Sequence, residues 1–295
     1  MIIRNGRQEE GRLLKRLTLC LCMLLLSLRL QAAAASELRV HFMDIDRNDG
    51  ILIECDGEAA FIDSGTHDYG VKAVRYMQSV GVEKLKYYIG THAHRDHVGG
   101  GAPILLAMEP EAVLVPHAGV RRQIKKQAAN EKEKAAANAA VYTIVSPGDE
   151  VALGGARLLV LGPLVITEGN NSSDLENENS LVLRLTLGNV RFLLTADSMA
   201  TSLRAIEEAS PGALRCDVLK NPHHNSRMED DLFSACSPRY VIFSTSDKYQ
   251  PPEAALEAAR AMGATPLITS GSQNGTVVFT TDGETLTLST ANLKP

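Results

Sequence analysis

The sequence has 295 residues, of which 44% are hydrophobic and 22% are charged. This balance excludes a disordered chain, a collagen-like chain and a small disulfide-packed domain, and it is typical of a globular protein with a large core. Aromatic residues make up only 4% and tryptophan is absent, which leaves little material for an aromatic platform that stacks single-stranded nucleic acid. Aliphatic side chains must therefore fill most of the interior.

The first 36 residues have the pattern of a secretory signal peptide. Basic residues precede an uncharged apolar run over residues 17–28, and the small residues 32–35 supply a cleavage region. The run is short for a membrane span, and an uncleaved anchor is the alternative because Arg29 follows the run directly. We therefore expect a protein exported to the cell envelope or the medium, beginning near Ser36 or Glu37, with no stable membrane insertion after cleavage.

Removal of this segment leaves an acidic chain with few cysteines. The segment carries six basic and two acidic residues, so its net charge of +4 leaves −9 from the −5 of the whole chain. A globally acidic surface binds nucleic acid poorly unless basic residues gather locally. The remaining cysteines are Cys55, Cys216 and Cys236, and their odd number and wide spacing disfavour both a disulfide framework and a thiolate metal site.

Short apolar runs rich in valine, isoleucine and leucine recur along the rest of the chain and predict strands. These runs cover residues 38–45, 51–55, 59–62, 85–89, 112–115, 141–145, 158–161, 181–187, 190–195, 218–220, 240–244, 277–280 and 285–288. Helical patterns occur between them at residues 69–80, 100–108, 120–140, 199–208 and 252–262. Two strand-rich halves flanked by helices predict one α+β domain over residues 37–295, built as a four-layer αββα sandwich.

Two polar segments interrupt this pattern. Residues 121–134 predict a charged helix, which is either a solvated face or a basic lip that attracts an anionic substrate. Residues 168–179 are rich in asparagine and acidic residues, so we expect a loop outside the core. That loop is either a simple connection or a part of the active site.

Four metal-competent side chains lie close together in THAHRDHVGG, residues 91–100: His92, His94, Asp96 and His97. Histidines at positions i and i+2 of an extended segment point to one side, and Asp96 and His97 on the following turn can point to a neighbouring position. Three histidines and an aspartate this close are poorly buried without a partner. Two metal ions in one pocket therefore explain the run better than a surface turn.

This run resembles the HxHxDH signature of the metallo-β-lactamase superfamily, and the order of elements from about residue 38 to residue 290 is similar to that superfamily's. Within it, the sequence resembles the extracellular hydrolase domain of ComEC-type DNA-uptake proteins and their secreted stand-alone relatives. The stretches that carry this resemblance are HFMDIDRNDGILIE, FIDSG, NENSLVLRLTLGNVRFLLTAD and DVLKNPHHNS. Nothing in the sequence resembles the membrane channel of such proteins.

The resemblance implies roles for residues outside the motif. Asp63 would orient the metal-site histidines, since a ligating imidazole commonly donates its other N–H to a carboxylate. Asp197 matches a carboxylate that bridges two metals, and His223 matches the late histidine ligand, with His224 as a catalytic acid or an outer residue. The expected metal ligands are His92, His94, Asp96, His97, Asp197 and His223. The expected catalytic residues are Asp63, Asp96 and His224.

The sequence departs from the ComEC-type pattern in two stretches, and from many other superfamily members in a third. Residues 46–50 read DRNDG where the pattern has Gly-Gln-Gly-Asp-Ser, so only Asp49 is retained. The late motif reads His-His-Asn-Ser instead of His-His-Gly-Ser, and residues 176–180 offer no further histidine, as in the ComEC-type branch itself. One metal would then have only His92, His94 and Asp197, which implies either an open, weaker site or an asparagine ligand. These departures bear on the substrate more than on the metal chemistry.

Histidine and aspartate ligands suit two divalent ions, zinc first and manganese second. Two ions roughly 3.5–4 Å apart would share a water and lower its pKa towards roughly 7, so the expected reaction is hydrolysis through a metal-bridged hydroxide. Lys220 would pair with a substrate phosphate, together with the charged helix, and Ser226 or Asn225 would donate a hydrogen bond to it. The other histidines, His41, His67 and His117, are expected to be structural.

Three functions are compatible with these features. The first is a secreted metal-dependent phosphodiesterase that acts on nucleic acid or on a phosphorylated envelope polymer. The second is a hydrolase of another ester or amide bond, such as a lactone, a thioester or a β-lactam. The third is a metal-binding module without turnover, which the intact set of ligands disfavours.

Overall fold

The computed structural model describes residues 36–167 and 173–291. The predicted signal peptide lies outside these residues, as does the beginning of the polar segment 168–179. The described part belongs to one unit, which begins at Ser36. None of its helices is long and apolar enough to cross a bilayer.

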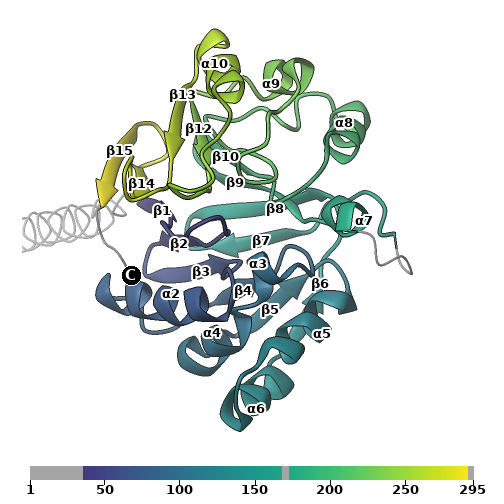
Figure 1. Cartoon of the computed structure of the whole chain (residues 1–295), viewed down its shortest axis with the longest axis vertical. Helices are drawn as coiled ribbons and strands as arrows, with labels where there is room; N and C mark the ends of the chain where they lie inside the picture. The colour runs from purple at the N-terminus through teal and green to yellow at the C-terminus, as the bar shows by residue number, and fades with distance from the viewer. Residues whose placement is uncertain (1–35, 168–172, 292–295) are drawn as a thin grey trace, which may run out of the picture. The chain divides into compact units, whose positions relative to one another are not determined.

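Two sheets form the centre of this unit (Figure 1). The first sheet has the strand order β15-β14-β1-β2-β3-β4-β5-β6. Its strands are β1 (Leu38–Phe42), β2 (Ile51–Cys55), β3 (Glu58–Ile62), β4 (Tyr87–Ile89), β5 (Ala112–Val115), β6 (Tyr142–Ile144), β14 (Thr276–Thr281) and β15 (Leu286–Ala291). The second sheet has the order β13-β12-β11-β10-β9-β8-β7. Its strands are β7 (Glu150–Leu153), β8 (Ala156–Gly162), β9 (Val182–Leu187), β10 (Val190–Leu194), β11 (Val218–Lys220), β12 (Tyr240–Phe243) and β13 (Thr265–Ile268).

Helices cover the outer face of each sheet, on opposite sides of Figure 1. The first sheet is covered by α2 (His67–Ser79), α4 (Gly101–Met108), α5 (Ala118–Gln127) and α6 (Glu131–Ala139). The second is covered by α8 (Ala200–Ala209), α9 (Asp230–Cys236) and α10 (Glu253–Ala261). Two short helices, α3 (Arg95–Val98) and α7 (Ser173–Glu178), lie in the connections. The predicted αββα sandwich is confirmed.

Three apolar clusters hold the four layers together. The central cluster joins the two sheets, where the Phe279 ring of the first sheet meets the Phe192 ring of the second with centroids 6.0 Å apart. The outer clusters contain Met77 of α2 beneath the first sheet and Leu203 of α8 above the second. Full burial of a large apolar side chain contributes about 1.5–3 kcal/mol relative to exposure, so these three interfaces explain why the chain adopts this layering.

The predicted helix over residues 120–140 is interrupted. α5 ends at Gln127 and α6 begins after Asn130, whose side chain accepts hydrogen bonds from the backbone N–H groups of Lys132 (3.1 Å) and Glu133 (3.0 Å). An asparagine in this position satisfies N–H groups that have no partner within the helix. The charged run is therefore two helices that meet at a capped turn.

Two edge strands and one polar segment also differ from expectation. β7 and β13 were not predicted; each lies at an edge of the second sheet, where the proline of β13, Pro266, is tolerated. Part of the expected loop 168–179 is the helix α7, and Asn177 and Asn179 are each only 2% exposed. Asn179 is buried because its amide bonds the backbone of Thr167, receiving its N–H at 2.8 Å and donating to its carbonyl at 3.0 Å. The expectation that this segment stays outside the core is wrong for these residues.

Candidate metal centre

The predicted site residues follow the carboxyl ends of four strands. Asp63 follows β3, the motif follows β4, Asp197 follows β10, and His223 and His224 follow β11. β3 and β4 are parallel, as are β10 and β11, and polar groups collect beyond the carboxyl ends of parallel strands. The backbone is left-handed at Asp63 (φ 55°), His223 (φ 52°) and His224 (φ 59°). Such φ values are costly for residues other than glycine and cluster at functional sites.

Glycines bring the end of the motif directly against α2. A Cβ on Gly100 would lie 2.6 Å from the Cα of Gly70 in α2, so neither position accepts a side chain. The backbone N–H of Gly100 also donates to the carbonyl of Gly65 at 2.8 Å. This packing fixes α3, which carries Asp96 and His97.

Side-chain atoms from four residues surround one point in the buried part of the site. His97 Nε2 lies 3.3 Å from His224 Nε2 and 3.2 Å from Asp197 Oδ1. His224 Nε2 lies 3.5 Å from Asp197 Oδ2 and 3.4 Å from Asp96 Oδ2. A tetrahedral zinc site with bonds of about 2.0–2.1 Å has edges of about 3.3–3.4 Å between its ligand atoms. These four separations match the edges of such a site, so His97, His224, Asp197 and Asp96 are candidate ligands of one divalent metal.

Unpartnered polar atoms support the same conclusion. Asp197 Oδ1, Asp49 Oδ1 and His224 Nδ1 are buried and make no hydrogen bond within the described residues. Ligand atoms of Asp49, His97, Asp197 and His224 all lie within 4.8 Å of one another. Buried polar atoms without a partner are costly, and a cation bound to Asp197 Oδ1 removes that cost for this atom.

Carboxylates behind the two histidines fix their orientation. His97 Nδ1 donates to Asp63 Oδ2 at 2.7 Å, and Asp63 also accepts from the backbone N–H and the hydroxyl of Thr91, at 2.9 and 2.7 Å. On the other side, His224 Nδ1 lies 3.5 Å from Asp49 Oδ1. Asp63 thus holds the position that the resemblance implies for it, as an orienting residue. Asp49 was not assigned from the sequence, although its retention in an otherwise altered turn was the available signal.

Lys220 is part of this buried cluster and does not reach the surface. Its side chain is 0% exposed, and its ammonium pairs with Asp49 Oδ2, donates to the carbonyl of Ala196 at 3.0 Å and lies 3.9 Å from Asp197 Oδ1. The expectation that Lys220 binds substrate is wrong, because its ammonium is enclosed by these groups. It neutralises part of the carboxylate charge from inside the protein.

The structure places His224, rather than His223, among the ligand atoms. The side chain of His224 is 1% exposed, whereas that of His223 is 35% exposed and its Nε2 is 3.8 Å from Asp197 Oδ2. Our preference for His223 as the ligand and His224 as the acid is therefore reversed. The half-buried Ser226 lines a pocket of about 210 Å³ next to His223, so it stays near the opening of the site.

The remaining motif histidines form a second, less complete half. His92 Nε2 and His94 Nδ1 lie 3.0 Å apart. His67 and His117 do not join them: His67 Nε2 lies 3.0 Å from a carboxylate oxygen of Glu133, and His117 Nε2 lies 3.1 Å from Glu176 Oε1. His92 and His94 therefore offer two further metal-competent nitrogens, and the His92 ring lies next to that of His97, with centroids 4.1 Å apart.

Helix α7 covers this second half. Glu176 Oε1 accepts the backbone N–H of Ala93 at 2.5 Å, and Ser173 Oγ lies 3.4 Å from His94 Nε2. Sequence analysis left open whether segment 168–179 belongs to the site, and the structure places its helical part against the motif. The polar composition of the segment gave no indication of which residues make the contact.

The charges of the cluster shift its pKa values in opposite directions. Although burial opposes protonation, the carboxylates of Asp197 and Asp63 raise the pKa of His97 well above its usual value. Burial likewise opposes protonation of His224, but Asp197 and Asp49 raise its pKa. Burial and the charge of His97 lower the pKa of His92 well below its usual value. The surroundings of His92 thus oppose its protonation, whereas the carboxylates favour protonation of His97 and His224.

Comparison with solved structures identifies the architecture. The metallo-β-lactamase fold protein YhfI from Bacillus subtilis aligns with 79% of this chain and 95% of its own, at 13% identity and a TM-score of 0.52. Igni18, a metallo hydrolase from Ignicoccus hospitalis, aligns with 82% of this chain and 98% of its own, at 13% identity and a TM-score of 0.52. The chain has the metallo-β-lactamase fold. No protein-family model matches the sequence, and no curated protein matches it.

A third neighbour shows that this fold does not fix the reaction. A mutant of the CmlA β-hydroxylase aligns with 78% of this chain and 52% of its own, at 12% identity and a TM-score of 0.51. Its name describes a hydroxylase, whereas that of Igni18 describes a hydrolase. Function must therefore be argued from the residues of the site.

Proposed function

We propose that this protein is an exported, metal-dependent hydrolase that cleaves phosphodiester bonds. The observation that carries the hydrolase part is the cluster of metal-competent atoms from His97, His224, Asp197 and Asp96, four pairs of which lie 3.2–3.5 Å apart. A divalent metal bound there supplies Lewis-acid stabilisation of negative charge and activation of water. Zinc suits this mixture of imidazole and carboxylate, and manganese is the second choice.

The residues of the site lie on two sides of the ligand histidines, one buried and one exposed to solvent. Asp63 and Asp49 lie behind the ligand histidines and hold their rings in place. Asp96 and His223 have side chains that are 44% and 35% exposed, so both face the side from which a substrate enters. His223 is placed to hydrogen-bond a substrate rather than to hold the cluster together.

The phosphodiester part rests on the resemblance to ComEC-type hydrolase domains, carried by FIDSG, DVLKNPHHNS and the two longer stretches. Nucleic acid and phosphorylated envelope polymers both contain phosphodiester bonds, and both are therefore candidate substrates. Export rests on the pattern of the first 36 residues. N-terminal sequencing of protein from the envelope or medium should find Ser36 or Glu37 first, and an intact Met1 on cytoplasmic protein would refute export.

A panel of substrates tests the reaction. Purified protein loaded with zinc or manganese would be assayed against bis-p-nitrophenyl phosphate, nitrocefin and a chromogenic lactone, with metal-treated His224→Ala protein as the matched control. We expect turnover of the phosphodiester that the control lacks. Turnover of nitrocefin or the lactone alone would instead favour a hydrolase of another ester or amide bond. A folded, metal-loaded protein inactive on every substrate would favour a binding module.

A further inference from the structure

We infer that Arg47, supported by Tyr249, forms a subsite at the mouth of the metal centre that binds the anionic phosphate of the substrate. This inference rests on the proposed function and deepens it, because it names residues that would select a charged diester over a neutral ester. The lysine that the sequence suggested for this role, Lys220, is buried.

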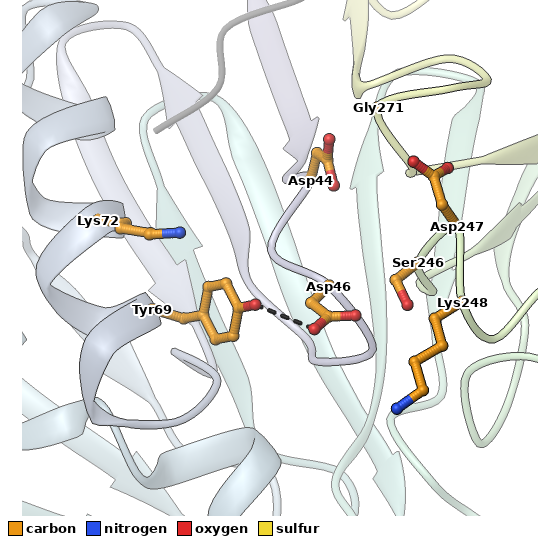
Figure 2. A pocket seen from close by; sticks show the side chains of 8 residues that line it. All are labelled: Asp44, Asp46, Tyr69, Lys72, Ser246, Asp247, Lys248 and Gly271. Carbon is orange, nitrogen blue, oxygen red and sulfur yellow. Dashed lines mark hydrogen bonds between the residues drawn. The ribbon is translucent and has the colours of Figure 1, made fainter.

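The backbone on both sides of Arg47 is fixed next to the metal centre. Asp49 lies in the buried cluster, and the amide of Asn48 donates to the carbonyl of Ile45 at 2.7 Å. Before Arg47, the carboxylate of Asp46 accepts from the hydroxyl of Tyr69 at 3.0 Å, as Figure 2 shows. The Arg47 side chain is exposed. Its guanidinium therefore projects to solvent from a rigid turn at the edge of the site.

Tyr249 supports this guanidinium. The Arg47 guanidinium carbon lies 5.7 Å from the centre of the Tyr249 ring, and Lys248 Nζ lies 4.9 Å from the same centre. A cation over an aromatic face is attracted to it, and arginine also stacks on the ring. The Tyr249 side chain is 41% exposed, so the two cations and the ring form one accessible surface.

Hydrogen bonds tie Tyr249 to the metal-site loop. The amide of Asn225, the residue after His224, donates to the Tyr249 carbonyl at 3.1 Å, and the Thr245 hydroxyl donates to the same carbonyl. Tyr249, and with it Arg47, is therefore held beside the loop that carries His223 and His224.

Arg47 has donors left for a ligand. Among the described residues, the arginines paired with a carboxylate are Arg39, Arg157, Arg204, Arg227 and Arg260. Arg47 is not one of them. A planar guanidinium presents a fork of N–H groups that matches two phosphate oxygens.

Two departures from the ComEC-type pattern meet in this subsite. Arg47 stands where that pattern has glutamine, and Asn225 stands where it has glycine. Asn225 holds the loop that carries Tyr249, and Tyr249 holds Arg47. The changed residues are thus connected in space and act on one feature, the charge at the mouth of the site.

The neighbouring pocket in Figure 2 is not the phosphate site. This pocket of about 430 Å³ is lined by the carboxylates of Asp44, Asp46 and Asp247 as well as by Lys72 and Lys248. Three carboxylates oppose an anion there. The cationic surface on Arg47, at the metal centre, is the better place for a phosphate.

Charge-removing variants of the full-length protein test this subsite. In zinc-loaded Arg47→Gln, we expect the KM for bis-p-nitrophenyl phosphate to rise about tenfold, with kcat changed by less than about threefold and metal content unchanged. Arg47→Lys should fall between wild type and Arg47→Gln, because it keeps the charge but loses the fork. Tyr249→Ala should raise KM, whereas Tyr249→Phe, which keeps the ring, should not. Arg75→Gln, which removes an exposed arginine of α2, is the matched control and should match wild type.

Binding of inorganic phosphate separates this inference from the proposed function. Calorimetry on the zinc-loaded protein needs no turnover, and Arg47→Gln should weaken phosphate binding about tenfold relative to both wild type and Arg75→Gln. That result supports the subsite even if no phosphodiester is cleaved. Equal KM and phosphate affinity in Arg47→Gln and Arg75→Gln would overturn the inference. Loss of metal in Arg47→Gln would also overturn it, because the residue would then act on the cluster itself.

Discussion

The two halves of the metal centre differ in how completely the protein surrounds them. In the half around His97 and His224, the two Nε2 atoms lie 3.3 Å apart next to Asp197, and a carboxylate stands behind each histidine. In the half around His92 and His94, two nitrogens lie 3.0 Å apart, and cover comes from the short helix α7. Groups that hydrogen-bond the ligand side chains and hold them in place raise metal affinity. We therefore expect the first half to bind metal more tightly, and the second to fill only at higher metal concentration.

The largest effect on hydrolysis should come from removing His224, and a much smaller one from removing the adjacent His223. His224→Ala removes a buried ligand atom and should reduce hydrolysis by at least about a thousandfold, with loss of metal. His223→Ala removes a side chain that is 35% exposed and should keep the metal, with activity reduced about tenfold or less. Metal analysis and steady-state kinetics of both variants measure this difference. Equal metal loss in the two variants would contradict the assignment.

His94→Ala sharpens the comparison between the halves. It removes one nitrogen of the less complete half, so we expect the protein to lose its weaker metal, keep the tighter one and remain folded. Hydrolysis should fall strongly if two metals are needed for turnover. A titration with zinc, followed by calorimetry, gives the number of sites. If wild type and His94→Ala bind the same number of ions, His94 is not a ligand.

Asp49→Asn tests the support behind His224. The variant weakens the carboxylate that faces His224 Nδ1, and metal affinity should fall about 10- to 100-fold. It also leaves the buried Lys220 without its ion-pair partner, which destabilises a protein by about 3–5 kcal/mol. The double variant Asp49→Asn/Lys220→Met should regain stability in a thermal unfolding experiment but not metal affinity. Recovery of both properties would show that Asp49 acts on the metal only through Lys220.

The smallest effect is a pH dependence of the metal-free protein. The raised pKa of His97 stabilises the fold below the usual imidazole pKa of 6.5, and this contribution is lost as pH rises through the higher folded value. The lowered pKa of Asp197 stabilises the fold above the usual carboxyl pKa of 3.8, and is lost as pH falls through the lower folded value. The lowered pKa of His92 removes stability as pH falls below 6.5, so stability should peak near the usual imidazole pKa.

Thermal unfolding from pH 5 to pH 9 measures this dependence. The Tm of the metal-free protein should fall as His97 deprotonates, by about 2–4 °C for each kcal/mol that the free energy of unfolding loses. The zinc-loaded protein should not, since metal binding has already displaced the proton. A metal-free Tm that rises from pH 6 to pH 9 would contradict the charge assignment of the cluster.

Local patterns in the sequence were sufficient for the layers and for the motif. The strand predicted at residues 51–55 has the bounds of β2, and the one at 218–220 those of β11, because continuous apolar runs in a sheet buried on both faces are hard to mistake. His92, His94, Asp96 and His97 are close in space because they are close in the chain. The edge strand β13 was missed because an edge accepts residues, such as Pro266, that a central strand does not.

The sequence by itself therefore determined the αββα class and the ligand run, since both depend on contacts between near neighbours or on periodic burial. Tertiary structure alone decided that His224 joins His97 across 127 residues, that Lys220 is buried with Asp49, and that Arg47 lies over Tyr249. The choice between His223 and His224 depends on two successive left-handed residues, with φ of 52° and 59°. Adjacent side chains in such a turn point in different directions, and only the surrounding packing fixes which of them is buried.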